Sequence, residues 1–314
     1  MKIIRDASLV SDRQFTESIV TIGVFDGVHI GHQDVIGRAW EIKKEIEARQ
    51  SIILTFDRHP MSVTHPEAVP PLLTTLDEKL TLLEKLPGDR IIVEHFSSEI
   101  ARIDYHEYIA RMLIERLGMV HLVVGYDFHL GRGREGSQER LVTEGAASGF
   151  GVTIVPPVVL SGRAVSSTKI RRAVLERRLD RVRRYLGRPY FFDADVVRGK
   201  ALGRTVGFPT ANVAVRAREK LMPPHGVYAV CVDLAEGSFN GMMNIGVAPT
   251  LHDDEQRRIE VHLLDFSGDL YDRRMRIHCI EFIREEKKFE SADALTEQLM
   301  HDRQKVLMIL EKKH

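Results

Sequence analysis

Strand-like and helix-like segments alternate through the first half of the sequence, and this pattern constrains the fold more than any other feature. Short apolar runs are followed by stretches with apolar residues at spacings of three and four. The expected strands are 19–25, 52–56, 90–95, 121–125 and 152–155, and the expected helices are 33–49, 76–86, 105–117 and 138–148. Such alternation indicates parallel strands joined by helical crossovers, in a sheet covered on both faces. Ligands of these sheets bind beyond the carboxyl ends of the strands.

The texture of the sequence changes after Gly187-Arg188-Pro189, which ends an arginine-rich helix expected over 168–186. A solvated helix face is a sufficient explanation for those arginines. Beyond them, β-branched or alternating runs follow one another without crossover helices, which favours antiparallel pairing in a sandwich or barrel. The expected strands are 191–198, 226–234, 241–246, 258–266 and 274–282, with one helix at 292–313. For a chain of 314 residues we therefore expect two domains, 1–185 and 186–314.

The charge balance argues against several classes of protein. The chain has 45 Lys+Arg and 45 Asp+Glu, so it lacks the positive excess that holds a nucleic-acid backbone. Asp6 and Asp12 stand where a signal peptide needs its apolar run, and Pro156 and Pro157 interrupt the longest uncharged stretch, 145–162, so no membrane span is indicated. Cys231 and Cys279 are too few for a disulfide framework or a cysteine zinc site. We expect a reduced, cytoplasmic protein with small-molecule substrates and no nucleic-acid or membrane partner; the oligomeric state stays open.

The densest motif is G-V-F-D-G-V-H-I-G-H at residues 23–32, where an expected strand runs into glycines and then a helix. Gly27 and Gly31 lack a Cβ, so a ligand can approach the backbone, and the amides and dipole of a helix start suit phosphate. His29 and His32 lie one turn apart and can both donate to charge that develops on a phosphate. Nucleotidyl transfer needs this arrangement. The alternative is two ordinary surface histidines beside a glycine turn.

Three later segments fit the same site. T-F-D-R-H-P at 55–60 and G-Y-D-F-H-L-G at 125–131 each lie at the end of an expected strand. S-S-T-K-I-R at 166–171 opens the arginine-rich helix with hydroxyl groups and two cations, which is a second way to hold phosphate, although a plain helix cap explains it equally well when it is taken alone.

One further segment has the glycine spacing of a dinucleotide-binding motif. G-R-G-R-E-G at 131–136 matches the dinucleotide fingerprint in form, but charged residues fill it and no acidic residue follows at the distance of a ribose. We interpret it as a basic, flexible loop. The sequence contains no G-x-x-x-x-G-K-[ST] motif, and the spacing of its histidines does not indicate a transition-metal site.

A second group of motifs lies in the other half of the chain. Three glycines four residues apart, with Lys200 and Arg204 between them, can fold tightly over phosphates. Thr210 and Asn212 offer the oxygen ligands that Mg²⁺ accepts. In the strand expected near 259–264, Glu260 lies on the face opposite the apolar residues, where a carboxylate can act as base for an alcohol attacking a γ-phosphate. A glycine hairpin without function and a solvated strand glutamate are the alternatives.

Together these residues resemble the family of bacterial bifunctional riboflavin kinase/FMN adenylyltransferases, also called FAD synthetases, over nearly the whole chain. The resemblance rests on segments 23–32, 55–60, 123–136, 166–171, 186–190, 199–212, 226–228, 244–246, 249–250, 260–266, 268–271 and 284–289. It implies a Rossmann-like α/β nucleotidyltransferase domain followed by a six-stranded antiparallel β-barrel kinase domain with a C-terminal helix. The implied reactions are phosphorylation of riboflavin by ATP to give FMN, and transfer of AMP from a second ATP to FMN to give FAD and pyrophosphate, both with Mg²⁺.

The resemblance also implies roles for individual residues. His29 and His32 would stabilise the phosphates of ATP in the transition state, and Glu260 would be the base for the ribityl 5′-hydroxyl. The other implied contacts are Gly23, Phe25, Asp26, Gly27, Gly31, Asp127, Ser167, Thr168 and Arg171 with the ATP of the adenylyltransferase; Asp57, Arg58, His59 and Pro60 on the FMN side; Gly199, Lys200, Gly203, Gly207 and Pro209 with the ATP of the kinase; and Thr210 and Asn212 with Mg²⁺.

The chain departs from the family pattern at two places near the expected FMN pocket. Arg58 stands where the family often has proline, and His129-Leu130 stands where Arg-Phe is common. AMP transfer stays the expected reaction, and both departures bear on the affinity for flavin and on the rate of this second step.

Two other functions are consistent with parts of the sequence. His29-Ile30-Gly31-His32 spells a signature of class I aminoacyl-tRNA synthetases, but the lysine-rich loop that accompanies it there is missing and the net charge is zero. A non-catalytic flavin-binding or storage protein would have no use for two separate phosphate-binding motifs. A product assay with riboflavin and Mg-ATP distinguishes these possibilities.

Overall fold

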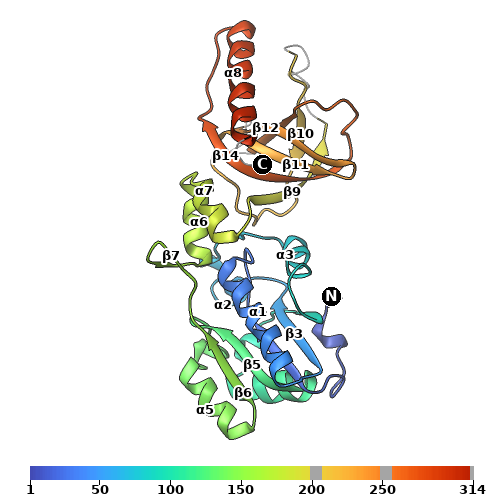
Figure 1. Ribbon diagram of the computed structural model, residues 1–314, viewed down its shortest axis with the longest axis vertical. Helices are drawn as coiled ribbons and strands as arrows, with labels where there is room; N and C mark the ends of the chain where they lie inside the picture. The colour runs from blue at the N-terminus through green and yellow to red at the C-terminus, as the bar shows by residue number, and fades with distance from the viewer. Residues whose placement is uncertain (199–206, 248–256, 312–314) are drawn as a thin grey trace. The chain divides into compact units, whose positions relative to one another are not determined.

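The computed structural model describes residues 1–198, 207–247 and 257–311, which fall into two compact units, Met1–Ser167 and Thr168–His314 (Figure 1). This division comes earlier in the chain than the boundary expected after residue 185. The strands of the first unit are β1 (Lys2–Ile4), β2 (Ser18–Ile22), β3 (Gln50–Phe56), β4 (Arg90–Glu94), β5 (Met119–Gly125), β6 (Gly151–Val155), β7 (Val159–Leu160) and β8 (Arg163–Ala164). Its helices are α1 (Ile30–Glu45), α2 (Met61–Thr64), α3 (Leu76–Leu83), α4 (Tyr105–Tyr108), the π-helical Ile109–Arg116 that continues it, and α5 (Gln138–Ser148), with short 3₁₀ turns at Ala7–Leu9, Pro66–Ala68, Ile100–Arg102 and Arg132–Arg134.

The first unit is built on a six-stranded sheet in the order β1-β4-β3-β2-β5-β6, with every pair parallel. Ile19 packs with α1 residues such as Val35 and Ile42, whereas its neighbour Val20 packs with Tyr108 and Leu113 on the opposite side. Successive residues of β2 therefore bury against helices on both faces, as the alternation predicted. The sheet order also brings the carboxyl ends of β3, β2 and β5 side by side.

The boundaries of the first site differ from the prediction. β2 ends at Ile22, three residues before the predicted end, and α1 begins at Ile30, three residues before the predicted start. The reason for the early strand end is the left-handed backbone at Phe25 and Gly27, which a strand cannot contain. A longer turn is thus available between the sheet and the helix.

The second unit begins with helices α6 (Ser167–Leu175) and α7 (Leu179–Leu186), where one helix was predicted. The prediction was wrong because α6 ends at a left-handed residue, Arg177, whose amide donates to Val174 while the Arg178 amide donates to Ala173. This pair of bonds satisfies the last carbonyls of a helix and stops it. Gly187 ends α7 in the same left-handed region, as predicted.

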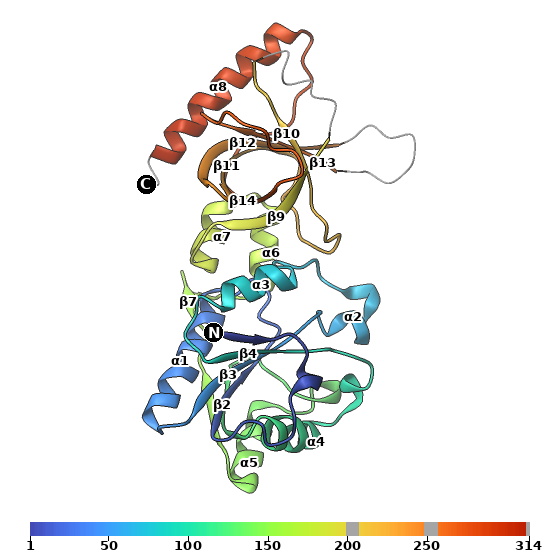
Figure 2. The same cartoon turned by 90° about the vertical axis from the view of Figure 1, so that its right-hand side faces the viewer.

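The rest of the second unit is a closed antiparallel barrel in the order β10-β13-β12-β11-β14-β9, and α8 packs on it, as Figure 2 shows. The elements are β9 (Tyr190–Val197), β10 (Ala211–Ala214), β11 (Gly226–Leu234), β12 (Gly237–Val247), β13 (Arg257–Leu263), β14 (Arg274–Arg284) and α8 (Ala292–Glu311). β10 was not predicted as a strand because its four residues are too short for periodicity to show. It nevertheless closes the barrel by pairing with both β9 and β13.

The barrel and the helix share an apolar cluster. Phe208, Val227 and Leu264 pack there with Val306 and Leu310 of α8. Across the part of the chain that the structure describes, no helix is both long and apolar enough to cross a membrane.

Candidate functional site

His29 and His32 lie where the chain passes from β2 to α1. His29 is the N-cap of α1, and its Nδ1 accepts a hydrogen bond from the His32 amide at 3.3 Å. An accepting Nδ1 carries no proton, so the neutral ring holds its proton on Nε2. The two imidazole rings stack with centroids 3.5 Å apart and planes 18° from parallel. The structure therefore brings the predicted histidine pair together at the positive end of a 16-residue helix.

The turn before the histidines has a strained backbone. Phe25, Gly27 and Val28 have φ values of +50°, +82° and +40°, and this region costs non-glycine residues about 1–3 kcal/mol each. Asp26 lies between them, and its buried carboxylate accepts hydrogen bonds from both amides of residues 73–74 at 3.0 Å. Bonds to a charged acceptor contribute about 1.5–3 kcal/mol each. Their sum is comparable to the strain, so Asp26 stabilises the turn from within.

The glycines of this motif make room for side chains of the motif itself. A Cβ on Gly23 would lie 3.0 Å from the Phe25 ring, and a Cβ on Gly31 would lie 3.2 Å from the His29 ring. From the sequence, Gly31 was predicted to let a ligand approach the backbone. In the structure its lack of a side chain also allows the His29 ring its place beside α1.

Two hydroxyl groups fasten the same turn. The Gly27 amide donates to Thr74 Oγ1 at 3.0 Å, and Ser167 Oγ donates to the main-chain oxygen of Asp26 at 2.9 Å. Ser167, the last residue of the first unit, therefore contacts the turn, and the phosphate-binding role of the motif at 166–171 stays a prediction. The other predicted ATP ligands of helix α6 are Thr168 and Arg171, which belong to the second unit.

Asp57 organises the loop at the carboxyl end of β3. One carboxylate oxygen accepts from the Phe96 amide at 3.1 Å, and the other lies 2.8 Å from His95 Nδ1 and 3.3 Å from Arg58 Nη2. Burial opposes ionisation of this carboxyl, but the bonds from Phe96 and His95 and the charge of Arg58 outweigh it and lower the pKa of Asp57. Asp57 thus joins the ends of β3 and β4 as a carboxylate.

The remaining predicted residues of the first unit lie at the same edge of the sheet. His59 Nδ1 accepts from the Met61 amide at 3.2 Å, and Pro60 precedes α2. Asp127 follows β5 with an exposed side chain, and its main-chain oxygen lies 3.0 Å from His129 Nδ1. His129 Nδ1 also lies 2.9 Å from an Arg134 nitrogen, so the basic loop contacts one of the departures from the family pattern.

Lys79 is a residue of this site that the sequence interpretation missed. It lies on α3 with 6% of its surface exposed, and its Nζ donates to Phe56 O at 2.7 Å and Val24 O at 3.1 Å. The sequence signal was its place in the apolar stripe of α3, three or four residues from Leu76 and Leu83. A lysine on the core face of a short helix needs polar partners.

The second unit carries a row of polar side chains across three neighbouring strands. Asn212 on β10, Glu260 on β13 and Asn244 on β12 lie opposite one another in the strand register. Residues in register share one face of a sheet. The flanking Ile259 and Val261 are buried, so the row lies on the side away from the barrel core, as predicted for Glu260.

Arg258 connects the row, and it was not predicted. Its Nη2 lies 2.6 Å from Glu260 Oε1, and its Nε lies 3.4 Å from Asn212 Oδ1. His262 Nδ1 lies 2.8 Å from Pro209 O and its ring contacts Phe208 edge-on, which fixes the end of the glycine loop. The sequence signal for Arg258 was period two: residues 258, 260 and 262 share one face of a strand.

The structure describes only part of the predicted phosphate loop. Gly199, Lys200 and Gly203 fall outside the described residues, whereas Gly207, with φ of +78°, Pro209 and Thr210 lead into β10. Among the described residues, no cluster of three or more His, Cys, Asp or Glu side chains could hold a metal ion. Thr210 and Asn212 carry neutral oxygen atoms, a kind of ligand that Mg²⁺ accepts when waters and phosphate oxygens complete its coordination.

Known proteins match both units. The family model for FAD synthetase matches residues 11–169, and the model for riboflavin kinase matches residues 186–310. A bifunctional riboflavin kinase/FMN adenylyltransferase of Pseudomonas fluorescens is 39% identical over 277 residues, covering 88% of each chain. The protein of that name from Escherichia coli K12 is 36% identical over 303 residues, covering 96% of each.

One solved structure matches nearly the whole chain. The crystal structure of a Streptococcus pneumoniae protein named as a macrolide-efflux protein superposes with a TM-score of 0.86 at 30% identity, covering 96% of this chain and 97% of the other. Since two family models match in the predicted order and the relatives align over nearly their full lengths, this chain belongs to the family of bifunctional riboflavin kinase/FMN adenylyltransferases.

Proposed function

We propose that His29 and His32 carry AMP transfer to FMN in the first unit, and that Glu260 carries phosphorylation of riboflavin in the second. The enzyme has both activities, with riboflavin, FMN and ATP as substrates and Mg²⁺ as the usual partner of ATP. The observation that carries the first assignment is the stacked histidine pair at the start of α1. The observation that carries the second is the Asn212–Glu260–Asn244 row with its arginine.

In the first reaction a phosphate oxygen of FMN attacks the α-phosphorus of ATP. A new P–O bond forms, the bond to pyrophosphate breaks, and negative charge grows on the leaving oxygens. The helix start of α1 and the histidine donors stabilise that charge. The strained turn at 25–28 fixes the donors before substrate arrives, and Gly23, Phe25, Asp26, Gly27 and Gly31 shape that turn around the nucleotide.

The other residues that we assign to this reaction lie at the start of α6 and at the ends of β3 and β5. Ser167 reaches the turn directly, and Thr168 and Arg171 of the same helix bind the triphosphate. Asp57, Arg58, His59 and Pro60 form the flavin side at the end of β3, and Asp127 lines the end of β5. Arg58 adds a cation where the family often has proline, held by Asp57 at 3.3 Å.

In the second reaction the ribityl 5′-hydroxyl of riboflavin attacks the γ-phosphorus of ATP. Glu260 takes the hydroxyl proton, and the bond to ADP breaks. Arg258 contacts Glu260 Oε1, and we assign the proton to Oε2. Thr210 and Asn212 would hold Mg²⁺, which neutralises phosphate charge. The proposed contacts with the ATP of the kinase are Gly199, Lys200, Gly203, Gly207 and Pro209.

One pair of variants tests both assignments on the full chain. His32→Ala, or His29→Ala, should slow conversion of FMN to FAD by about 10²-fold or more, the effect of losing a transition-state donor, while FMN formation continues. Glu260→Gln should slow FMN formation by about 10²–10⁴-fold and leave adenylylation of supplied FMN intact. Chromatography of riboflavin, FMN and FAD measures both rates. Equal loss of both activities in either variant, or normal turnover, would contradict its assignment.

We also propose that the protein works in the cytoplasm. Both reactions consume ATP, and the relatives are bacterial metabolic enzymes. Fractionation of cells followed by the same product assay tests the location, and activity in the membrane or exported fraction would overturn it.

A further inference from the structure

Lys79 is a buried lysine that contacts two loops of the first site. Its ammonium donates to the carbonyl oxygens of Phe56, the last residue of β3, and Val24, two residues past the end of β2. The residue after each carbonyl begins a loop of the site: Phe25 begins the strained turn before the histidine pair, and Asp57 begins the proposed flavin loop. One buried cation therefore joins the two loops that must present ATP and FMN to each other.

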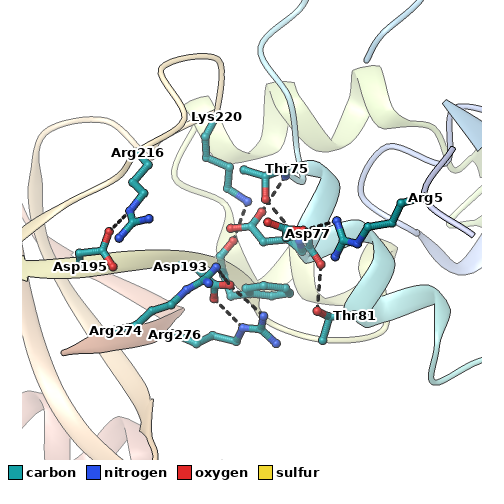
Figure 3. A network of polar contacts seen from close by, with 12 residues as sticks. Arg5, Thr75, Asp77, Thr81, Asp193, Asp195, Arg216, Lys220, Arg274 and Arg276 are labelled. Carbon is teal, nitrogen blue, oxygen red and sulfur yellow. Dashed lines mark hydrogen bonds and ion pairs between the residues drawn. The ribbon is translucent and has the colours of Figure 1, made fainter. Parts of the chain in front are cut away.

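The position of Lys79 is itself fixed by the capping of α3. Thr75 Oγ1 accepts from the Glu78 amide at 3.3 Å and the Glu78 carboxylate accepts from the Thr75 amide at 2.9 Å, a reciprocal cap. Arg5 Nη1 pairs with Asp77 at 2.9 Å on the same helix, and Figure 3 shows both side chains. Lys79 directly follows Glu78, so the cap fixes the turn of α3 from which the Lys79 side chain extends.

Burial makes this ammonium sensitive to pH. Desolvation lowers the pKa of Lys79 to about 8, although the carboxylates of Asp26 and Asp57, the charged groups that act on it, oppose the shift. Neutral lysine keeps two N–H donors but loses the charge that strengthens its bonds to the carbonyls. Thr55 Oγ1 lies 3.3 Å from Val24 O and remains as a weaker tie.

We propose that Lys79 is a positioning residue for AMP transfer, whose ammonium sets the distance between the turn at 25–28 and the loop at 57–60 through the carbonyls of Val24 and Phe56. The proposal rests on the assignment of AMP transfer to the histidine pair. It assigns Lys79 no contact with substrate.

The test compares Lys79→Met with Lys85→Met in the full chain, because Lys85 is an exposed lysine just beyond α3. Lys79→Met should lower kcat for FMN adenylylation about 10- to 100-fold, the effect of misplacing reacting groups, with KM for ATP changed less than about threefold. Riboflavin phosphorylation in the second unit should stay normal in both variants. A normal adenylylation kcat in folded Lys79→Met would overturn the proposal.

The pH profile separates positioning from simple stability. In the wild type, kcat for adenylylation should fall above about pH 8, and Lys79→Arg, which stays charged, should move that fall to higher pH. If Lys79→Met does not fold, Lys79→Arg decides: an unshifted fall in the folded variant contradicts the proposal. His32→Ala distinguishes failure of the lysine proposal from failure of the histidine assignment. Normal AMP transfer in His32→Ala would contradict the histidine assignment. Slow AMP transfer in His32→Ala together with a normal rate in Lys79→Met would contradict only the lysine proposal.

Discussion

Glu94 is a titratable residue inside the first unit that neither reaction uses. It ends β4 with 6% of its surface exposed, and its Oε2 has no hydrogen-bond partner among the described residues. Among the described residues, the buried Tyr108 Oη and Arg116 Nε also have no hydrogen-bond partner. Burial raises the pKa of Glu94 to about 7, and the charge of Arg116 offsets only part of that effect.

We expect Glu94→Gln to stabilise the first unit at neutral and alkaline pH. The folded-state pKa of about 7 lies above the ordinary value of 4.5, so the folded protein binds more protons between these values and its free energy of unfolding falls as pH rises through 7. The shift corresponds to about 3 kcal/mol. Urea unfolding followed by fluorescence of Trp40, the single tryptophan, measures the first unit. The variant should exceed the wild type above pH 7 and match it near pH 4.5; a constant difference across this range would contradict the assignment.

The places of single residues were predicted well where a motif or strand alternation set them, and poorly where a distant part of the fold did; their chemical roles stay predictions. His29, His32 and Glu260 stand where spacing and alternation placed them. Asp26 was read as an ATP contact, and the structure adds that its carboxylate fastens residues 73–74, which lie far from it in sequence. No local pattern contains such a partner, and the same is true of Lys79.

At the scale of elements, α8 is tied to the barrel by one buried ion pair. Arg284, at the end of β14, donates to both carboxylate oxygens of Asp302 at 2.8–3.1 Å. The Asp302 side chain is 3% exposed and the Arg284 side chain 15%. Gln298 adds a bond at 3.0 Å. The pair fixes the helix over the apolar cluster that also holds Phe208 of the glycine loop.

Asp302→Ala should destabilise the second unit by about 3–5 kcal/mol, because it leaves a buried guanidinium without its partner. Exposed Glu297 on the same helix is the matched control, and its alanine variant should change stability by about 0.5 kcal/mol or less. The temperature at which riboflavin kinase activity is half lost measures the effect. Replacing both members, Arg284→Met with Asp302→Leu, should restore most of the loss. A double variant as unstable as Asp302→Ala would show that the charges stabilise the helix in another way.

Elements with strong periodicity were predicted closely, and short or kinked ones were not. α5 and β11 have the predicted bounds, because each has a regular pattern and clear ends. β1 and β10, of three and four residues, carry too few side chains for a period to appear. The break between α6 and α7 was hidden because Arg177 adopts a conformation usually taken by glycine.

At the scale of the molecule, the α6–α7 pair shows contacts with the barrel. Arg177 Nη2 donates to His225 O at 3.1 Å, and its guanidinium lies 4.7 Å from the ring centre of Phe282. Helix α7 packs on β9 and β14. The boundary expected after residue 185 separates these helices from their contacts, whereas the division before Thr168 keeps them.

Two fragments test the domain boundary. Both 186–314 and 168–314 should fold, convert riboflavin to FMN in Mg-ATP and make no FAD, because the glycine loop, Asn212 and Glu260 lie in each. The longer fragment should melt a few degrees higher, since about 1 kcal/mol shifts Tm by roughly 2–4 °C in a domain of about 150 residues. Circular dichroism and chromatography measure both properties. A folded but inactive 168–314 fragment would show that residues of the first unit complete the kinase site.

The pairing of β9 with β14 affects the order in which the two units can fold during synthesis on the ribosome. The first strand of the barrel joins its last one, which leaves the ribosome about ninety residues later. At roughly 5–20 residues per second, β14 follows β9 by on the order of 5–20 seconds, although β10, the other neighbour of β9, is made sooner. The parallel sheet of the first unit is complete at Val155, before any of the barrel is made. A nascent chain can therefore acquire the fold that makes FAD before it acquires the fold that makes FMN.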